Sequence, residues 1–174
     1  MDLLQVMMNR RSVRKYTGEP VPEEKLERIL QAGLVSASGR RMKPWEFIVV
    51  KDKDKLCSLS KCREHGPSII AGADCAIVVA ADEEKTDVWT EDCSIAMANM
   101  HLMADSLGVG SCWVQVRLRE APDGRSAEEY IRELLAIPEK YKVEAILSLG
   151  IPAEHPEPHT AEELPKEKVH REKF

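Results

Sequence analysis

The residues with the clearest chemical potential form a cationic cluster, Arg10-Arg11-Ser12-Val13-Arg14-Lys15-Tyr16. Side chains of an extended chain alternate between two faces, so Arg10, Ser12 and Arg14 would point in one direction. Two guanidinium groups beside a hydroxyl group can bind a phosphate, because arginine offers paired N–H donors and keeps its positive charge. On spacing alone, a solvated basic turn or a nucleic-acid-binding patch also accounts for these residues.

A second cationic group follows in a polar loop, where Arg40, Arg41 and Lys43 precede Trp45. Trp45 leads directly into an apolar run, so we expect its indole ring to be a core anchor. For Arg41 we expect a solvated side chain. On the residues alone, solvation also explains the other basic side chains of this loop.

Several common enzyme motifs are missing from the sequence. It contains no Gly-x-x-x-x-Gly-Lys-Ser/Thr phosphate loop, and Gly108-Val109-Gly110 is followed by Trp113 where a dinucleotide fingerprint needs glycine. Ser12 has no recognisable base partner, and Gly-x-Ser-x-Gly does not occur. No histidine has metal-ligand spacing, and for His101 we expect a hydrogen-bonded core or interface position. We therefore name no catalytic side chain and no metal site, and an enzyme of this sequence would depend on a bound cofactor.

Length and composition are those of one soluble domain over residues 1–174. The chain has 43% hydrophobic residues and a formal net charge of −5, and this acidic balance argues against a nucleic-acid-binding module. No apolar run of about 18 residues is present to span a bilayer. The first residues do not resemble a secretory signal, so we expect a cytoplasmic location. The five cysteines are odd in number and never spaced as Cys-x-x-Cys, which predicts neither a disulfide framework nor a zinc site.

Hydrophobic periodicity predicts alternating helices and strands. We expect helices over 2–9, from Pro22 to Leu34, and over 54–61, 67–72, 90–107 and 126–136, and strands over 47–50, 75–81, 111–116 and 145–149. The strand over 75–81 is apolar on both faces, which is typical of a central strand. Gly33 within an apolar stripe indicates a close approach to a neighbour, and Gly108 is placed to end the long helix in a left-handed cap.

The tail over residues 153–174 differs in composition from the rest of the chain. It is rich in Pro, Glu, Lys and His, and its only sizeable apolar residues are Leu164, Val169 and Phe174. Such a segment cannot form a core of its own. It is therefore either disordered or covers another surface, which in a homodimer could belong to the second subunit.

Four segments together resemble the FMN-dependent nitroreductase family. They are Arg10 to Tyr16, Ser38-Gly39-Arg40 through Val50, Ala104 to Trp113, and Leu149-Gly150-Ile151-Pro152 with its polar tail. The resemblance implies an α+β fold with a mainly antiparallel central sheet flanked by helices. It also implies an intertwined homodimer, with a C-terminal extension crossing to the partner and one FMN at each of two interface sites.

The resemblance also implies which positions contact FMN. Arg10, Ser12 and Arg14 would hold the phosphate and ribityl chain, with Arg11 assisting. Ser38 and Arg40 would reach the isoalloxazine ring from the other subunit. The backbone around Trp113 and Val114 would lie against the ring, and a tail lysine, Lys168 or Lys166, would approach the phosphate. Arg41 and Lys43 stand where many relatives carry Asn and Gln, a departure that bears on substrate range.

The activity implied by the resemblance is a ping-pong transfer of a hydride. NAD(P)H would dock transiently and reduce the flavin, and an electron-poor small molecule such as a nitroaromatic or a quinone would then be reduced, with no side chain acting as acid or base. Flavin fragmentation and reductive dehalogenation are alternatives on the same scaffold, as is a flavin-binding protein without turnover. The alternative from a different class is a small nucleic-acid-binding module.

Overall fold

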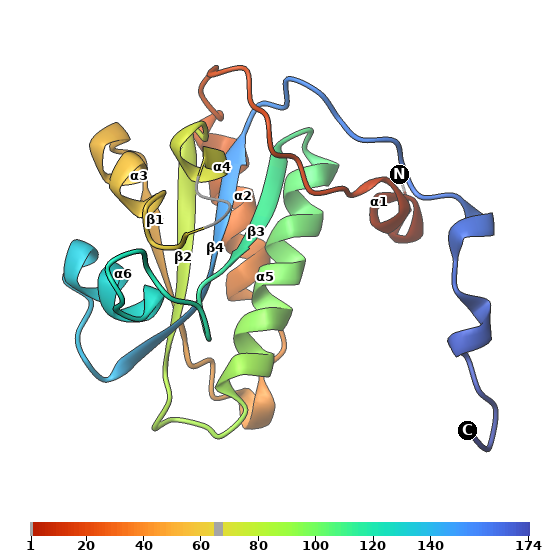
Figure 1. Ribbon diagram of the computed structural model, residues 1–174. Coiled ribbons are helices and arrows are strands. Elements are labelled where there is room, and N and C mark those ends of the chain that lie inside the picture. The colour runs from red at the N-terminus through yellow and green to blue at the C-terminus, as the bar shows by residue number, and fades with distance from the viewer. Residues whose placement is uncertain (1, 65–67) are drawn as a thin grey trace.

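A four-stranded antiparallel sheet forms the centre of the computed structural model, which describes residues 2–64 and 68–174 (Figure 1). The strand order is β1-β2-β4-β3, and all three pairings are antiparallel. The strands are β1 (Trp45–Val50), β2 (Cys75–Asp82), β3 (Gly110–Gln115) and β4 (Tyr141–Gly150). The expected α+β fold is confirmed, and β2 is central with every residue buried, as its apolar sequence predicts.

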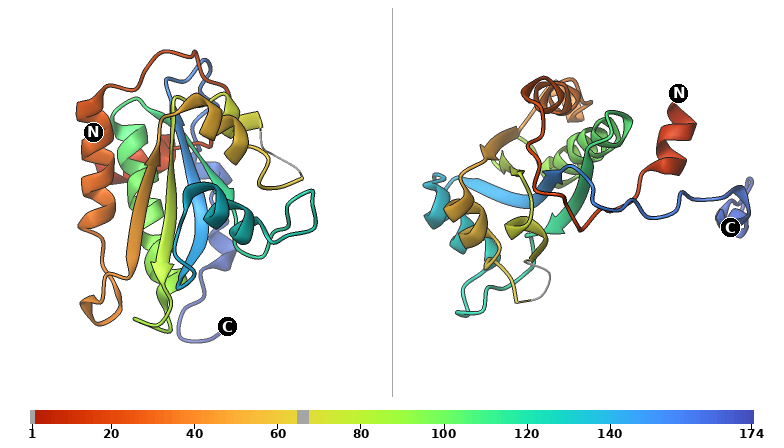
Figure 2. Two further views of the ribbon diagram at one scale, coloured as in Figure 1. Left: turned by 90° about the vertical axis from the view of Figure 1, so that its left-hand side faces the viewer. Right: turned by 90° about the horizontal axis from the view of Figure 1, so that it is seen from above.

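Helices cover both faces of the sheet (Figure 2). On one face lie α2 (Glu23–Leu34) and α5 (Trp89–Ser106), and on the other lie α3 (Lys53–Leu59), α4 (Ser68–Ala71) and α6 (Ala127–Leu135). Because successive residues of a strand point to opposite faces, Ile77 packs with α2 and α5 while Val78 packs with α3, α4 and α6. Met1, His65 and the first residue of the helix expected over 67–72 lie outside the described residues.

The pairing of α2 and α5 depends on Gly33. A Cβ atom at this position would lie 2.9 Å from Met100 Sδ and 3.0 Å from a ring carbon of Phe47. Gly33 therefore lets the two helices approach closely, as its place in the apolar stripe predicts. Leu34 is the last residue of the helix and is 53% exposed.

Helix α5 brings the chain to the free edge of the sheet. It ends at Ser106, and Gly108 follows with φ of +69°, which confirms the expected left-handed cap. The amide of Val109 donates to the carbonyl oxygen of Ala104 at 2.9 Å and so closes the end of the helix. The next strand, β3, pairs with β4 on one side only and leaves its other edge to the N-terminal part of the chain.

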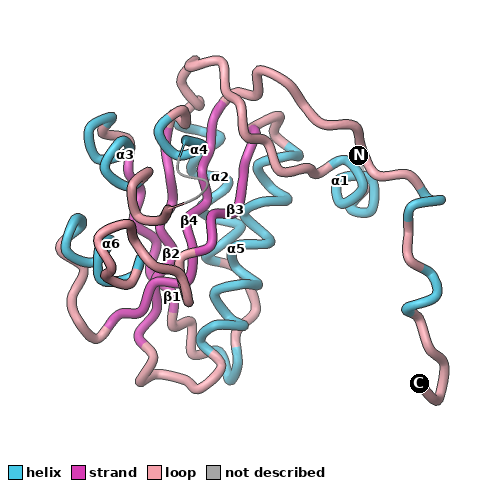
Figure 3. The backbone as a smooth tube through the Cα atoms, viewed as in Figure 1, coloured by secondary structure: helices cyan, strands magenta, loops and turns pink. Residues whose placement is uncertain are grey.

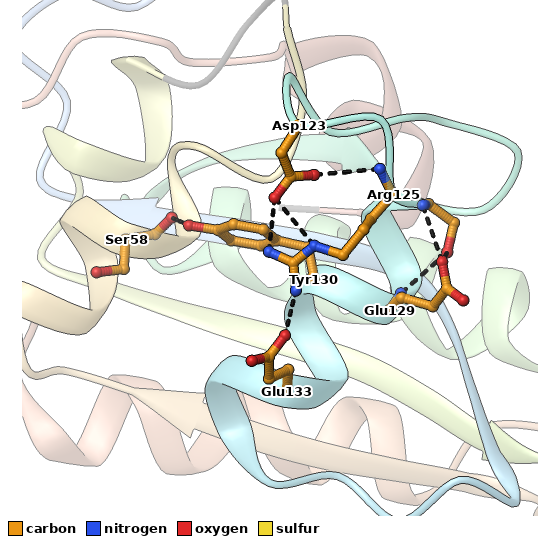
Figure 4. Close-up of polar contacts among 7 residues, drawn as sticks. Ser58, Asp123, Arg125, Glu129, Tyr130 and Glu133 are labelled. Atoms are coloured by element: carbon orange, nitrogen blue, oxygen red, sulfur yellow. Dashed lines mark hydrogen bonds and ion pairs between the residues drawn. The ribbon is translucent and has the colours of Figure 1, made fainter.

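Helix α6 is held against α3 by a polar cluster at its N-terminal end (Figure 4). The Arg125 guanidinium lies over the ring of Tyr130 at 5.1 Å, pairs with Asp123 at 2.6 Å and also contacts Glu133. The hydroxyl group of Tyr130 donates to the carbonyl oxygen of Ser58 at 3.1 Å. The hydrogen bond from Tyr130 joins the two helices on the face opposite α5, and the Arg125 contacts hold the Tyr130 ring, which gives the cluster a structural role.

Helix α1 (Leu3–Asn9) projects from the body of the molecule (Figure 1). Asp2 caps it, because its carboxylate accepts from the Gln5 amide at 2.9 Å. Only Val6 of this helix is buried, while Leu3 and Leu4 are 64% and 66% exposed. The helix therefore presents an apolar face that the other described residues do not cover.

The chain after α1 runs antiparallel to the chain after β4. The amide of Thr17 donates to Ile151 O at 2.9 Å, and the amide of Ala153 donates to Lys15 O at 3.0 Å. Farther along, the His159 amide donates to Met8 O at 2.8 Å. We call these two segments, residues 8–17 and 151–159, the terminal ribbon. They lie side by side, and after the end of α1 they are drawn almost entirely as loop (Figure 3). The rest of the tail extends away with two short 3-10 turns, η2 (Ala161–Glu163) and η3 (Lys166–Lys168).

No helix among the described residues combines the length and apolar character needed to cross a bilayer. Within the same residues, no group of His, Cys, Asp and Glu side chains is arranged to hold a metal ion.

Candidate functional site

Arg10, Ser12 and Arg14 lie around the buried thiol of Cys112 on β3. Burial raises the pKa of this thiol, whereas Arg14, a hydrogen bond with Ser12 and Arg10 each lower that pKa. Ser12 thus contacts this thiol directly, and the guanidinium groups of Arg10 and Arg14 are close enough to act on its charge.

The side chains between them point elsewhere. Val13 is 1% exposed and packs on Gly110, where a Cβ atom would lie 2.7 Å from Val13 Cγ1. Arg11 donates to the carbonyl oxygen of Glu157, and Lys15 pairs with Glu154 at 3.0 Å. Arg11 and Lys15 therefore bind the tail, and the close approach of Val13 requires glycine on β3.

The guanidinium groups of Arg10, Arg11 and Arg14 have no carboxylate within ion-pair distance among residues 2–64 and 68–174. Arg14 donates to Ser12 O at 3.3 Å, and Arg10 contacts the Nε2 atom of His101 at 3.1 Å. Arg10 and Arg14, two cationic side chains without a counter-charge, favour an anion at this place. The donor set fits the phosphate group of FMN.

Tyr16 fixes the C-terminal end of the cluster Arg10 to Tyr16, which is called the cationic segment from here on. Its hydroxyl group shares a hydrogen bond of 2.8 Å with Ser148 Oγ, and burial raises the pKa of the phenol. The ring lies on Gly150, where a Cβ atom would be 2.6 Å from Tyr16 Cδ1. β3 and β4 therefore each place a glycine under this segment.

The second cationic group lies in a constrained loop around η1 (Gly39–Arg41). The amide of Gly39 donates to Asp92 Oδ1 at 2.8 Å, and the amide of Lys43 donates to Ser38 Oγ at 3.0 Å. Arg40 is exposed and pairs with Asp87 at 3.5 Å. As predicted, Trp45 after the loop is buried, at 5% exposed, and Arg41 is exposed.

The backbone of this loop is strained. Arg40, Arg41 and Lys43 have φ values of 50°, 60° and 46°, a left-handed region that costs a residue with a side chain about 1 kcal/mol or more. Asp92, 2% exposed on α5, holds the loop through Gly39, and its Oδ2 atom has no hydrogen-bond partner within the described part of the chain. Nothing in the sequence near residue 38 indicates this contact.

The cationic segment and the loop with Arg40 contact different turns of α5. The loop contacts Asp92 in the first turn, whereas Arg10 contacts His101. These two helix positions are separated by roughly 13 Å along the axis. Within one chain, the structure therefore does not bring Ser38 and Arg40 together with Arg10.

The remaining expected residues differ in their placement. Trp113 is half-buried on β3, and its Nε1 atom donates to Gln115 Oε1 at 2.8 Å. Val114 is 3% exposed with its side chain in the core on the α6 face, so only its backbone is available to a ligand. Lys168 lies exposed in η3, on the part of the tail that extends away from the body. Neither Lys168 nor Lys166 is brought to Arg10 within one chain.

His101 and Ser111 lie next to Arg10 in the candidate site, but the sequence did not assign them to it. His101 is buried, as expected, and its ring bridges Arg10 and the hydroxyl group of Ser111. No local pattern reveals this bridge, because Arg10 and His101 are distant in sequence and meet only when α5 packs beside the cationic segment.

Comparisons with known proteins find relatives that match nearly the whole chain. The Nitroreductase family profile matches residues 7–69 and 58–151. A protein of Archaeoglobus fulgidus, named as an NADH dehydrogenase/NAD(P)H nitroreductase, is 35% identical over 178 residues, covering 99% of each chain.

Two solved structures share the fold. The FMN-dependent nitroreductase of Clostridium difficile superposes with a TM-score of 0.95 at 46% identity, over 98% of this chain and 99% of that one. A nitroreductase from Desulfovibrio desulfuricans in complex with FMN has a TM-score of 0.80 at 27% identity, over 100% of this chain and 98% of that one. The family profile matches most of the chain, and the alignments with these relatives cover nearly its whole length. The chain therefore belongs to the nitroreductase family.

Proposed function

We propose that this protein is an FMN-dependent oxidoreductase that transfers a hydride from NAD(P)H to an electron-poor acceptor, a nitroaromatic or a quinone. The observation that carries the proposal is the cationic segment at the free edge of the sheet. There Ser12 contacts the Cys112 thiol, Arg10 contacts His101, and neither Arg10 nor Arg14 has a carboxylate partner among the described residues. Relatives of similar length are named NAD(P)H nitroreductases, and one is FMN-dependent.

Each residue of the segment has a part in this proposal. Arg10 and Arg14 supply N–H donors and positive charge to the phosphate, and Ser12 supplies a hydroxyl donor between them. Arg11 lies beside this face and assists through its charge while it binds the tail. The bound FMN supplies the hydride acceptor and donor, and the protein orients it. The backbone at Trp113 and Val114 would lie against the ring, and no side chain would be required as an acid or a base.

We further propose that the functional unit is a homodimer. The loop with Ser38 and Arg40 is too far along α5 to meet Arg10 in its own chain, so a second subunit would bring the two groups together. The groove between α1, α2 and α5 is lined by apolar side chains that a partner would cover, among them Leu3, Val6, Ala32, Val35, Leu102 and Met103. The tail, with Lys166 and Lys168, would cross to that partner.

The proposal includes a single domain over residues 1–174 and a cytoplasmic location. One sheet with helices on both faces supports the first. The five cysteines are all unpaired, which supports a reducing compartment.

The test is the visible spectrum of the purified protein, followed by anaerobic addition of NADH and of NADPH in separate titrations. We expect a yellow protein whose flavin absorbance is bleached by at least one nicotinamide and restored by a nitroaromatic or a benzoquinone. A colourless protein that takes up no added FMN would contradict the proposal. If the protein binds flavin but neither NADH nor NADPH bleaches it, the protein is a flavin-binding protein with another reaction.

A further inference from the structure

The ring of His101 forms a bridge between the cationic segment and the edge strand. His101 is 8% exposed on α5. Its Nε2 atom lies 3.1 Å from Arg10 Nη1, and its Nδ1 atom forms a hydrogen bond with Ser111 Oγ. The carbonyl oxygen of Ser111 also accepts a hydrogen bond from the amide of Val13. One side chain thus connects the helix, the strand and the arginine.

The contacts determine where the proton of the imidazole lies. A guanidinium group has N–H donors and no acceptor, so the Nε2 atom of His101 must accept from Arg10. In a neutral imidazole the proton is then on Nδ1, which donates to Ser111 Oγ. A charged ring would turn an N–H group and a positive charge toward Arg10. Burial, followed by the charge of Arg10, lowers the pKa of His101 to about 4, in agreement with a neutral ring.

A neutral acceptor has a specific advantage at this position. A carboxylate would also orient the guanidinium, but it would cancel the charge that attracts a phosphate. The nearby carboxylate of Asp105 is engaged otherwise, because it accepts from Asn9 Nδ2 at 2.8 Å and contacts His155 Nε2 at 3.2 Å. Arg10 therefore keeps its full charge and its remaining N–H donors while one of its nitrogens is fixed by the imidazole.

We propose that His101 is a positioning residue for phosphate recognition, which holds the Arg10 guanidinium toward the phosphate of FMN and thereby sets the preference for FMN over riboflavin. The inference rests on the proposed function and deepens it. Riboflavin provides the discriminating probe, because it has the same ring and ribityl chain and lacks only the phosphate. A residue that merely supports the fold would affect both ligands alike.

The experiment measures the dissociation constants of FMN and riboflavin by quenching of flavin fluorescence. We expect His101→Leu to weaken FMN binding roughly 10- to 100-fold, the range for loss of a hydrogen bond to a charged group. Riboflavin binding should stay within about twofold of wild type. His101→Gln places an amide oxygen near the former Nε2 position and should recover most of the FMN affinity. The same substitution at a neighbouring histidine that does not contact Arg10, His155→Leu, should leave the FMN-to-riboflavin ratio unchanged.

A double-mutant cycle separates positioning from loss of fold. In the Arg10→Ala background, His101→Leu should have no further effect on the FMN dissociation constant, because the group that it positions is absent. A His101→Leu protein that loses FMN and riboflavin equally would overturn the inference, and so would an effect that persists in full without Arg10. If wild-type protein binds no FMN, the proposed function fails. If it binds FMN well and His101→Leu leaves the ratio unchanged, only the present inference fails.

Discussion

The amide of Val13 donates a 2.9 Å hydrogen bond to the carbonyl oxygen of Ser111, and this contact aligns the cationic segment with the free edge of the sheet. Val13 then points into the core, while Ser12 beside it forms a hydrogen bond with the Cys112 thiol and Arg14 donates to Ser12 O. We infer that the register of this backbone contact decides which cations are available to a ligand, while Arg11 and Lys15 contact the tail.

Arg14 and Lys15 provide a matched pair for testing this register. Arg14→Ala should weaken FMN binding roughly 10- to 100-fold, because a charge-assisted contact to the phosphate is lost. Lys15→Ala removes the same charge from the other face, where Lys15 pairs with Glu154 on the surface, and should change the FMN dissociation constant less than about threefold. Equilibrium titration of the apoprotein measures both constants. Equal losses in the two variants would show that net charge, and not the face, controls binding.

Gly150 tests the close contact beneath Tyr16. A methyl group there would lie 2.6 Å from the Tyr16 ring, so Gly150→Ala should lower the free energy of unfolding by about 1–3 kcal/mol and weaken FMN binding as the segment shifts. Gly72→Ala is the control, because its nearest atom would be Ser68 O at 3.5 Å, and its effect should stay within about 0.5 kcal/mol. Urea denaturation measures both values. A Gly150→Ala protein as stable as wild type would contradict the contact.

The low pKa of His101 predicts a pH dependence of stability. Its pKa is lowered from 6.5 to about 4, so between these values the unfolded chain binds a proton that the folded chain does not. The free energy of unfolding should therefore fall as the pH falls from 6.5 to about 4, with this group contributing up to about 3 kcal/mol. The charged groups that face the ring are Arg10, from the cationic segment, and Asp105, from its own helix.

The His101→Gln variant isolates this contribution because it has no titrating ring. Denaturation at intervals from pH 4 to pH 8 should give a shallower loss of stability for the variant than for wild type, with parallel curves above pH 6.5. Parallel curves over the whole range would mean that the ring titrates at the same pH in both the folded and the unfolded state.

The tail tests the proposed dimer. Residues 161–174 are exposed, so their deletion should leave the free energy of unfolding of a single chain nearly unchanged. If Leu164, Val169 and Phe174 pack on a partner, the deletion should raise the dimer dissociation constant, measured by sedimentation velocity. A Lys166→Ala, Lys168→Ala double variant keeps these apolar side chains and should remain dimeric. Unchanged association after the deletion would contradict a tail that crosses to the second subunit.

The sequence alone predicts the elements of this fold because their signals are local. Asp2 and the acidic pair after Pro22 mark the starts of α1 and α2, and the apolar run of β2 identifies the central strand. The start of β4 was missed: it begins at Tyr141 and not at Ala145, because the strand includes polar positions. Glu144 is one of them, 4% exposed within the sheet, where burial raises the pKa of its carboxyl group.

The site was predictable only in part, for a physical reason. Alternation along an extended segment is a local property, so spacing alone predicts a shared face for Arg10, Ser12 and Arg14, and this stays a prediction. Contacts between distant segments have no such signal. The bridge from Arg10 to His101 and the support of the cationic loop by Asp92 arise only when α5 is packed.

The terminal ribbon also sets an order of assembly during synthesis. The cationic segment leaves the ribosome early, but Ser111 on β3 and Ile151 after β4 emerge only about a hundred or more residues later. Contacts between partners so far apart in sequence must meet the entropy cost of loop closure before they stabilise the fold, and they are slow to form. The cationic segment is therefore synthesised early but reaches its final position late in folding. A nascent chain stalled before β4 would expose the arginines of this segment without the strand edge that aligns them.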